Sequence, residues 1–139
     1  MPKIVPNLWF DAQAEEAAEF YCSVFPNSRI VSIAHYPPEI GSAPGSVMTV
    51  EWELDGQRFV GINGGPMFTF SEAVSFQITC RDQHEVDRYW DALVDGGEES
   101  QCGWLKDRYG LSWQVVPDGM DEILPTRTRS GPAGRWRRC

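Results

Sequence analysis

At 139 residues, of which 42% are apolar, the chain is long enough for one compact domain with a hydrophobic core and too short for two ordinary domains. Its net charge of −8 argues against nucleic acid as a main partner, because phosphate binding requires clustered Lys and Arg. No apolar run approaches the ~20 residues of a membrane helix, so we expect a soluble, cytoplasmic protein without a membrane partner.

The first part of the chain predicts a strand followed by a helix. In the segment 3–10, Leu8 and Phe10 face one side of the strand, and Asn7 and Trp9 face the other. Asp11 suits a helix N-cap, and apolar residues then recur at helical spacing until Pro26. The expected helix therefore starts directly after Asp11.

Three further strands are expected in this first half. Residues 29–36 are rich in β-branched side chains, and residues 47–54 alternate between apolar and polar. Asp55 and Gly56 suit a two-residue hairpin turn, because both tolerate the positive φ values that such a turn requires. Residues 58–62 form the returning strand.

The second part of the chain repeats this order of elements. Residues 75–80 alternate as a strand does, and Asp82 with Glu85 forms a variant of the capping box at the start of a helix. Residues 98–116 accommodate two or three short strands, with a turn near residues 108–110. Both halves thus predict strand, helix and antiparallel strands.

Such an internal repeat is a strong indication of fold. Each copy alone would leave one face of a small curved sheet exposed, so we expect an α+β fold of paired βαβββ modules that form curved mixed sheets with helices outside. The modules are expected at about residues 3–66 and 74–118, within a single domain of residues 1–124. Residues 125–139 form a basic tail that we expect to be disordered.

Sequence segments in both halves carry a family resemblance: Asn-Leu-Trp-Phe-Asp at 7–11, Asn-Gly-Gly-Pro at 63–66, and Cys-Gly-Trp-Leu-Lys-Asp-Arg-Tyr-Gly-Leu-Ser-Trp-Gln at 102–114. The chain resembles the vicinal-oxygen-chelate superfamily of glyoxalases, bleomycin-resistance proteins and dihydroxybiphenyl dioxygenases. Within it, the chain is similar to the PhnB-like group, also described as 3-demethylubiquinone-9 3-methyltransferase. The resemblance covers about residues 3–118 and implies a glyoxalase-like fold and a homodimer, in some relatives formed by exchange of modules.

The methyltransferase description does not agree with the sequence. A methyl donor such as S-adenosylmethionine normally lies at a Gly-rich turn between strand and helix of a parallel sheet. Here Asn63-Gly-Gly-Pro leads into a linker, and the chain has no doubly wound pattern. We therefore do not expect methyl transfer, and the resemblance leaves enzymatic activity open.

The resemblance also raises the question of a metal ion. Metal-dependent members of the superfamily bind one divalent ion through His, Glu or Gln on the first and last strand of each module. The corresponding positions in this chain are those of Val5 or Asn7, Gly61 or Asn63, Ser75 or Gln77, and Gln114. None of them is a His or a carboxylate, so we expect no metal cofactor. A metal-dependent lyase, isomerase or dioxygenase is the alternative.

Amide and aromatic side chains remain to line the expected cleft between the modules. Such groups hold a small polar or planar ligand by hydrogen bonds and stacking. The candidate ligand-binding residues are Asn7, Trp9, Asn63, Gln77, Trp104, Trp113 and Gln114. The alternatives are that these side chains fill the core, or that the chain is mainly a dimeric interaction module.

No motif defines catalytic residues. Glu51 and Glu53 are the general-base candidates if the polar side of their strand faces the cleft. Asp107 is expected in a surface turn. The four cysteines lack zinc-site spacing, and Cys22 and Cys80 fall on sides expected to be buried.

Overall fold

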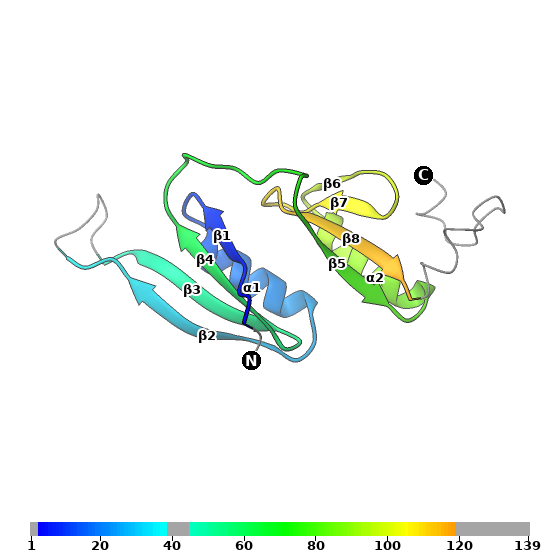
Figure 1. Cartoon of the computed structure of the whole chain (residues 1–139), viewed down its shortest axis with the longest axis horizontal. Coiled ribbons are helices and arrows are strands. Elements are labelled where there is room, and N and C mark those ends of the chain that lie inside the picture. Colours follow the sequence, from blue (N-terminus) through cyan, green and yellow to red (C-terminus); the bar gives the residue numbers. More distant parts are fainter. Residues whose placement is uncertain (1–2, 39–44, 119–139) are drawn as a thin grey trace. The chain divides into compact units, whose positions relative to one another are not determined.

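A computed structural model describes residues 3–38 and 45–118 (Figure 1). The chain divides between Thr69 and Phe70 into two compact units. The first unit contains β1 (Asn7–Phe10), α1 (Ala14–Val24), β2 (Ser28–His35), β3 (Val47–Leu54) and β4 (Gln57–Asn63). The second contains β5 (Ser75–Cys80), α2 (Gln83–Val94), β6 (Glu98–Glu99), β7 (Trp104–Lys106) and β8 (Ser112–Pro117).

Both units therefore have the βαβββ order, and the predicted α+β fold is confirmed. The predicted basic tail at 125–139 lies outside the described residues, as does the predicted domain end at residue 124.

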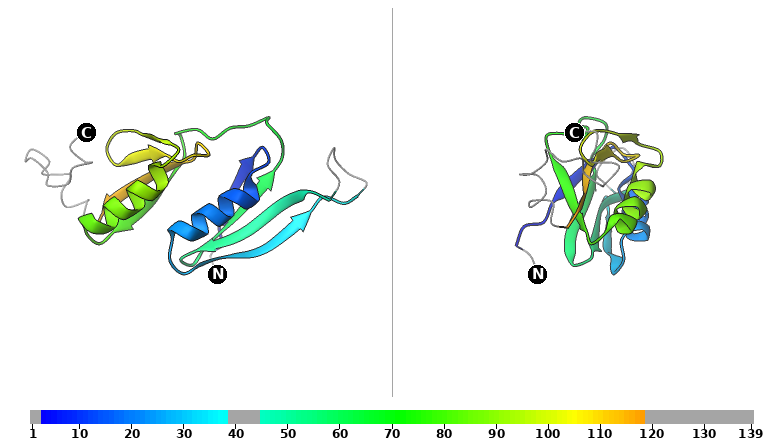
Figure 2. Two further views of the ribbon diagram at one scale, coloured as in Figure 1. Left: turned by 180° about the vertical axis from the view of Figure 1, so that it is seen from behind. Right: turned by 90° about the vertical axis from the view of Figure 1, so that its right-hand side faces the viewer.

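The first unit is a mixed sheet covered on one face by α1, as Figure 2 shows. Its strand order is β1-β4-β3-β2, with β1 parallel to β4 and the other pairs antiparallel. The alternation predicted for residues 47–54 is confirmed, since Val50, Trp52 and Leu54 are buried. Trp52 stacks between Tyr21 of α1 and Phe59 of β4, with ring centroids 6.1 and 5.8 Å away. This aromatic stack is the centre of the first core.

The start of α1 differs from the prediction. The helix begins at Ala14, with Gln13 in the N-cap position, and the predicted N-cap Asp11 is wrong. The Ala14 N–H instead donates to Asn63 Oδ1, at 2.8 Å. Because β4 is parallel to β1 and pairs Asn63 with Phe10, the end of β4 lies beside the start of the helix. A side chain 49 residues away in sequence thus replaces the local cap.

The second unit has the same design. Its strand order is β5-β8-β7-β6, with β5 parallel to β8, and α2 packs on one face. The predicted cap by Asp82 is confirmed, because the Glu85 N–H donates to Asp82 Oδ1 at 2.9 Å. The Glu85 carboxylate accepts from the Arg81 N–H, at 2.9 Å, one residue before the position of an ordinary capping box. Trp90 and Leu93 of α2 are buried. Neither described helix is long and apolar enough to cross a membrane.

Asp107 is another departure from the sequence-based expectation. Its carboxyl side chain is 2% exposed, so the predicted position at the surface of a turn is wrong. The carboxylate accepts hydrogen bonds from the backbone N–H groups of Tyr109 and Leu111, at 2.8 and 3.1 Å, and from Trp113 Nε1, at 2.9 Å. These bonds satisfy the buried charge and connect the turn to β8.

Candidate functional site

The second sheet has one face that α2 leaves uncovered. Residues paired in register on neighbouring strands share a face, and the register places Gln77 of β5, Gln114 of β8 and Trp104 of β7 side by side. Leu105 and Trp113 point to the α2 side and are 1% and 3% exposed. The structure thus brings three of the predicted residues together and separates Trp113 from them.

A second row lies beside the first, about 6.6 Å away along the strands. It consists of Ser75 of β5, Ser112 of β8 and Lys106 of β7. Gln114 Nε2 donates to Ser75 Oγ at 2.9 Å, which links the two rows. The two rows, Gln77–Gln114–Trp104 and Ser75–Ser112–Lys106, are called the open face of the second sheet below.

In the first unit, Asn7 and Trp9 lie on the face of the sheet that α1 leaves uncovered. Trp9 Nε1 donates to the Gly65 carbonyl at 2.9 Å, and its ring meets Phe68 edge to face at 4.9 Å. A Cβ at Gly64 would lie 2.3 Å from the Trp9 ring. Only glycine therefore permits this contact, and the Asn-Gly-Gly-Pro segment serves to pack Trp9.

Asn63 lies on the opposite side of β4, at the start of α1. Its Oδ1 accepts from the Ala14 N–H, and its Nδ2 donates to the Val47 carbonyl at 3.1 Å. Its own carbonyl accepts from the Tyr36 hydroxyl at 2.6 Å. Both ends of the amide are thus used to join three elements, and ligand binding by Asn63 stays a prediction.

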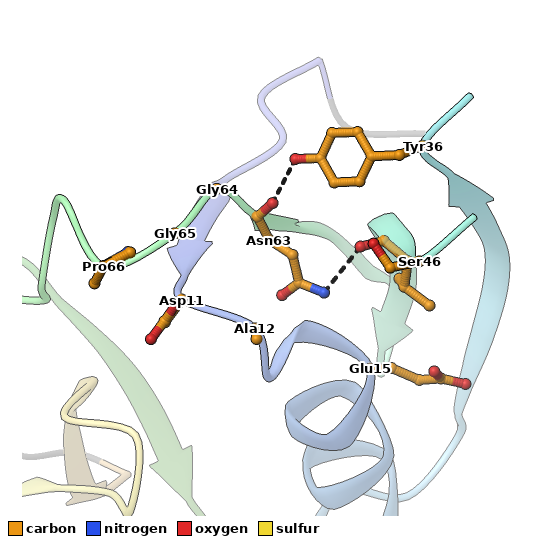
Figure 3. A pocket seen from close by; sticks show the side chains of 10 residues that line it. Asp11, Ala12, Glu15, Tyr36, Ser46, Asn63, Gly64, Gly65 and Pro66 are labelled. Atoms are coloured by element: carbon orange, nitrogen blue, oxygen red, sulfur yellow. Dashed lines mark hydrogen bonds between the residues drawn. The ribbon is translucent and has the colours of Figure 1, made fainter. Parts of the chain in front are cut away.

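Asn63 also lines a pocket of about 580 Å³, shown in Figure 3. The pocket belongs to the first unit, and its lining consists of Asp11, Ala12, Glu15, Tyr36, Ser46, Val47, Asn63, Gly64, Gly65 and Pro66. Of these residues, only Asn63 is among the ligand-binding candidates predicted from the sequence. The Asn-Gly-Gly-Pro segment was the available signal, because it places glycines where the chain turns away from β4.

The general-base candidates Glu51 and Glu53 are held in ion pairs. Arg58 of β4 pairs with Glu51, and its Nη2 lies 4.0 Å from Glu53 Oε1. Ser32 Oγ also donates to Glu51, at 3.0 Å. The hydrogen bond from Arg58, with a smaller effect from Ser32, lowers the pKa of Glu51. A carboxylate with a lowered pKa is a weaker base, so the geometry favours a structural role.

The donor atoms of the open face do not suit a divalent metal ion. At the positions expected from the resemblance, Ser75, Gln77 and Gln114 offer hydroxyl and amide groups, and the Gln114 N–H is directed at Ser75. The ammonium of Lys106 lies on the same face and opposes a second cation. Among the described residues, no three His, Cys, Asp or Glu side chains are grouped to hold a metal.

Two βαβββ units, each with one helix on a mixed four-stranded sheet, define a glyoxalase-like fold. The model of the family described as 3-demethylubiquinone-9 3-methyltransferase matches residues 2–116. The chain belongs to this family, which confirms the predicted resemblance to the PhnB-like group.

Solved structures agree with this assignment. A PhnB protein from Bacillus cereus is 35% identical, with a TM-score of 0.76 and coverage of 84% of this chain and 99% of that chain. The protein PA1353 from Pseudomonas aeruginosa is 19% identical, with a TM-score of 0.72 and coverage of 84% and 98%.

A more distant structure is that of FosX, a fosfomycin resistance protein from Listeria monocytogenes solved with Mn(II) and sulfate. It is 12% identical, with a TM-score of 0.59 and coverage of 91% and 99%, and it shows the shared fold alone. A search among curated proteins finds no match to this chain.

Proposed function

We propose that this protein binds a small polar or planar organic ligand on the open face of its second sheet. The observation that carries the proposal is the row formed by Gln77, Gln114 and Trp104 on three adjacent strands. Side-chain amides both donate and accept hydrogen bonds, and an indole offers a flat apolar surface for stacking.

The exposure and the hydrogen bonds of these three side chains support the proposal. Trp104 and Gln114 are half-buried, and Gln77 is exposed. The bond from Gln114 Nε2 to Ser75 orients that amide and leaves its Oε1 as an acceptor. Gln77 Nε2 donates to Thr79 Oγ1 at 3.2 Å, a bond at the surface that a ligand can replace at little cost. Gln114 on β8 is therefore held in one orientation before a ligand binds, whereas Gln77 on β5 can reorient to contact it.

An NMR titration with benzamide, a planar molecule that carries one amide, tests this proposal. We expect saturable shifts in the side-chain amide signals of Gln77 and Gln114 and in the indole signal of Trp104. Trp104→Ala should weaken binding by about three- to tenfold, because stacking contributes ~0.5–1.5 kcal/mol.

Gln83→Ala is the matched control, since Gln83 lies on α2 and bonds to Asp87. This variant should bind benzamide as the parent chain does. Shifts confined to residues of α2, or equal weakening by both substitutions, would refute the proposal.

A further inference from the structure

Lys106 is the cationic residue of the open face. Strand register places it beside Ser112, one row from Trp104 and Gln114. Its side chain is 31% exposed, and its Nζ lies 3.1 Å from Glu72 Oε2. A half-buried ammonium next to amide and hydroxyl groups is a combination that binds anionic oxygen atoms.

Glu72 occupies the place of such an anion. It lies just before β5, and its side chain is 66% exposed. The pKa of Glu72 is lowered mainly by a hydrogen bond to its own backbone and, to a smaller extent, by the hydrogen bond from Lys106. The carboxylate is therefore charged at neutral pH. An ion pair this exposed is weak, and the anionic group of a ligand can displace it. Glu98, which pairs with Lys106 in register on β6, is also exposed.

Ser112 provides an independent observation. It stands between Ser75 and Lys106 in the same row and is 1% exposed. Its hydroxyl has no hydrogen-bond partner within the described part of the chain. Buried hydroxyl groups are normally paired. Because this hydroxyl is shielded from solvent, an anionic oxygen held by Lys106 can accept from it only after the side chains that cover it move aside.

We infer that the ligand of the open face carries an anionic oxygen group, either carboxylate or phosphonate, which Lys106 binds in place of Glu72. This inference rests on the ligand-binding proposal above and adds the chemical class of the ligand. Trp104 and Gln114 hold the body of the ligand, and Glu72 is an internal competitor for its charge. The exchange replaces one ion pair with another, so Lys106 stays neutralised in both states.

The affinities of three matched probes, benzoate, phenylphosphonate and the neutral benzamide, test the inference by NMR titration. Both anions should bind more tightly than benzamide, and added salt should reduce this advantage. Glu72→Gln should raise the affinity for the anions by about two- to fivefold and leave benzamide unchanged. Lys106→Gln should lower the affinity for the anions by about tenfold.

Asp95→Asn is the control, because it removes a carboxylate from a different exposed ion pair of the same unit, the one with Arg108. It should leave all three affinities unchanged. The order of benzoate and phenylphosphonate identifies which anionic group is preferred, and either order supports the inference.

Equal binding of all three probes, with no effect of Glu72→Gln or Lys106→Gln, would overturn the inference while the ligand-binding proposal stands. Absence of any shift on the open face with every probe would overturn both. Circular dichroism of each variant establishes that it is folded.

Discussion

Asp107 shows how one residue can decide the conformation of a turn. Its buried carboxylate accepts from two backbone N–H groups and from the indole of Trp113. Asp107→Asn should place an amide N–H against one of these donors, and we expect a loss of about 1–3 kcal/mol in the free energy of unfolding. Urea denaturation measures this loss.

The exposed Asp95→Asn is the comparison for this substitution. Its effect should stay below about 1 kcal/mol, because it breaks a surface ion pair. Equal effects of the two substitutions would contradict the role assigned to Asp107.

Cys80 is a buried thiol with a predictable effect on stability at high pH. Burial, with a smaller effect of Glu85, raises the pKa of Cys80 from 9.0 to about 11. Between these two values the unfolded chain releases the thiol proton and the folded chain keeps it. This group therefore lowers the free energy of unfolding as pH rises from about 9 to 11.

Melting temperatures of the parent chain and Cys80→Ala measure this effect between pH 8 and about 11. The parent should lose stability more steeply than the variant over this range. Parallel curves would show that the thiol titrates normally in the folded protein.

At the scale of the elements, the sequence correctly predicted those features that depend on residues close together in the chain. The alternation of residues 47–54, the Asp55-Gly56 turn and the Asp82 cap are all confirmed, because each depends on residues a few positions apart. The N-cap of α1 was missed because its acceptor, Asn63, comes from β4. No local pattern indicates that contact.

Two substitutions test whether Asn63 or Asp11 caps the start of α1. Asn63→Ala should destabilise the protein by about 0.5–2 kcal/mol, the usual effect of losing an N-cap acceptor. Asp11→Ala should change the free energy of unfolding by less than about 0.5 kcal/mol, as surface substitutions do. Chemical denaturation measures the free energy of unfolding of both variants. A larger loss for Asp11→Ala than for Asn63→Ala would show that Asp11 is the cap.

The candidate site could be predicted only in part. Gln77, Trp104 and Gln114 were identified individually, and strand register then placed them in one row. Trp113 was grouped with them although it is adjacent to Gln114 on a strand, where successive side chains point to opposite faces. Lys106 was missed because its importance depends on its neighbours across the strands.

At the scale of the whole molecule, the family resemblance leads us to propose a homodimer. Several large apolar side chains, including Met67, Phe68 and Val74, are exposed in the single chain. Light scattering during size-exclusion chromatography should give twice the 15.7 kDa mass of one chain. A mass of one chain at all concentrations would contradict this proposal.

The proposed binding of a small ligand to the open face of the second sheet can be observed directly by NMR. The decisive measurement is that of intermolecular NOEs between the ring protons of bound benzamide and the protein. We expect contacts to the indole protons of Trp104 and to the side-chain amide of Gln114. Contacts to residues of α2, or none at saturating benzamide, would contradict it.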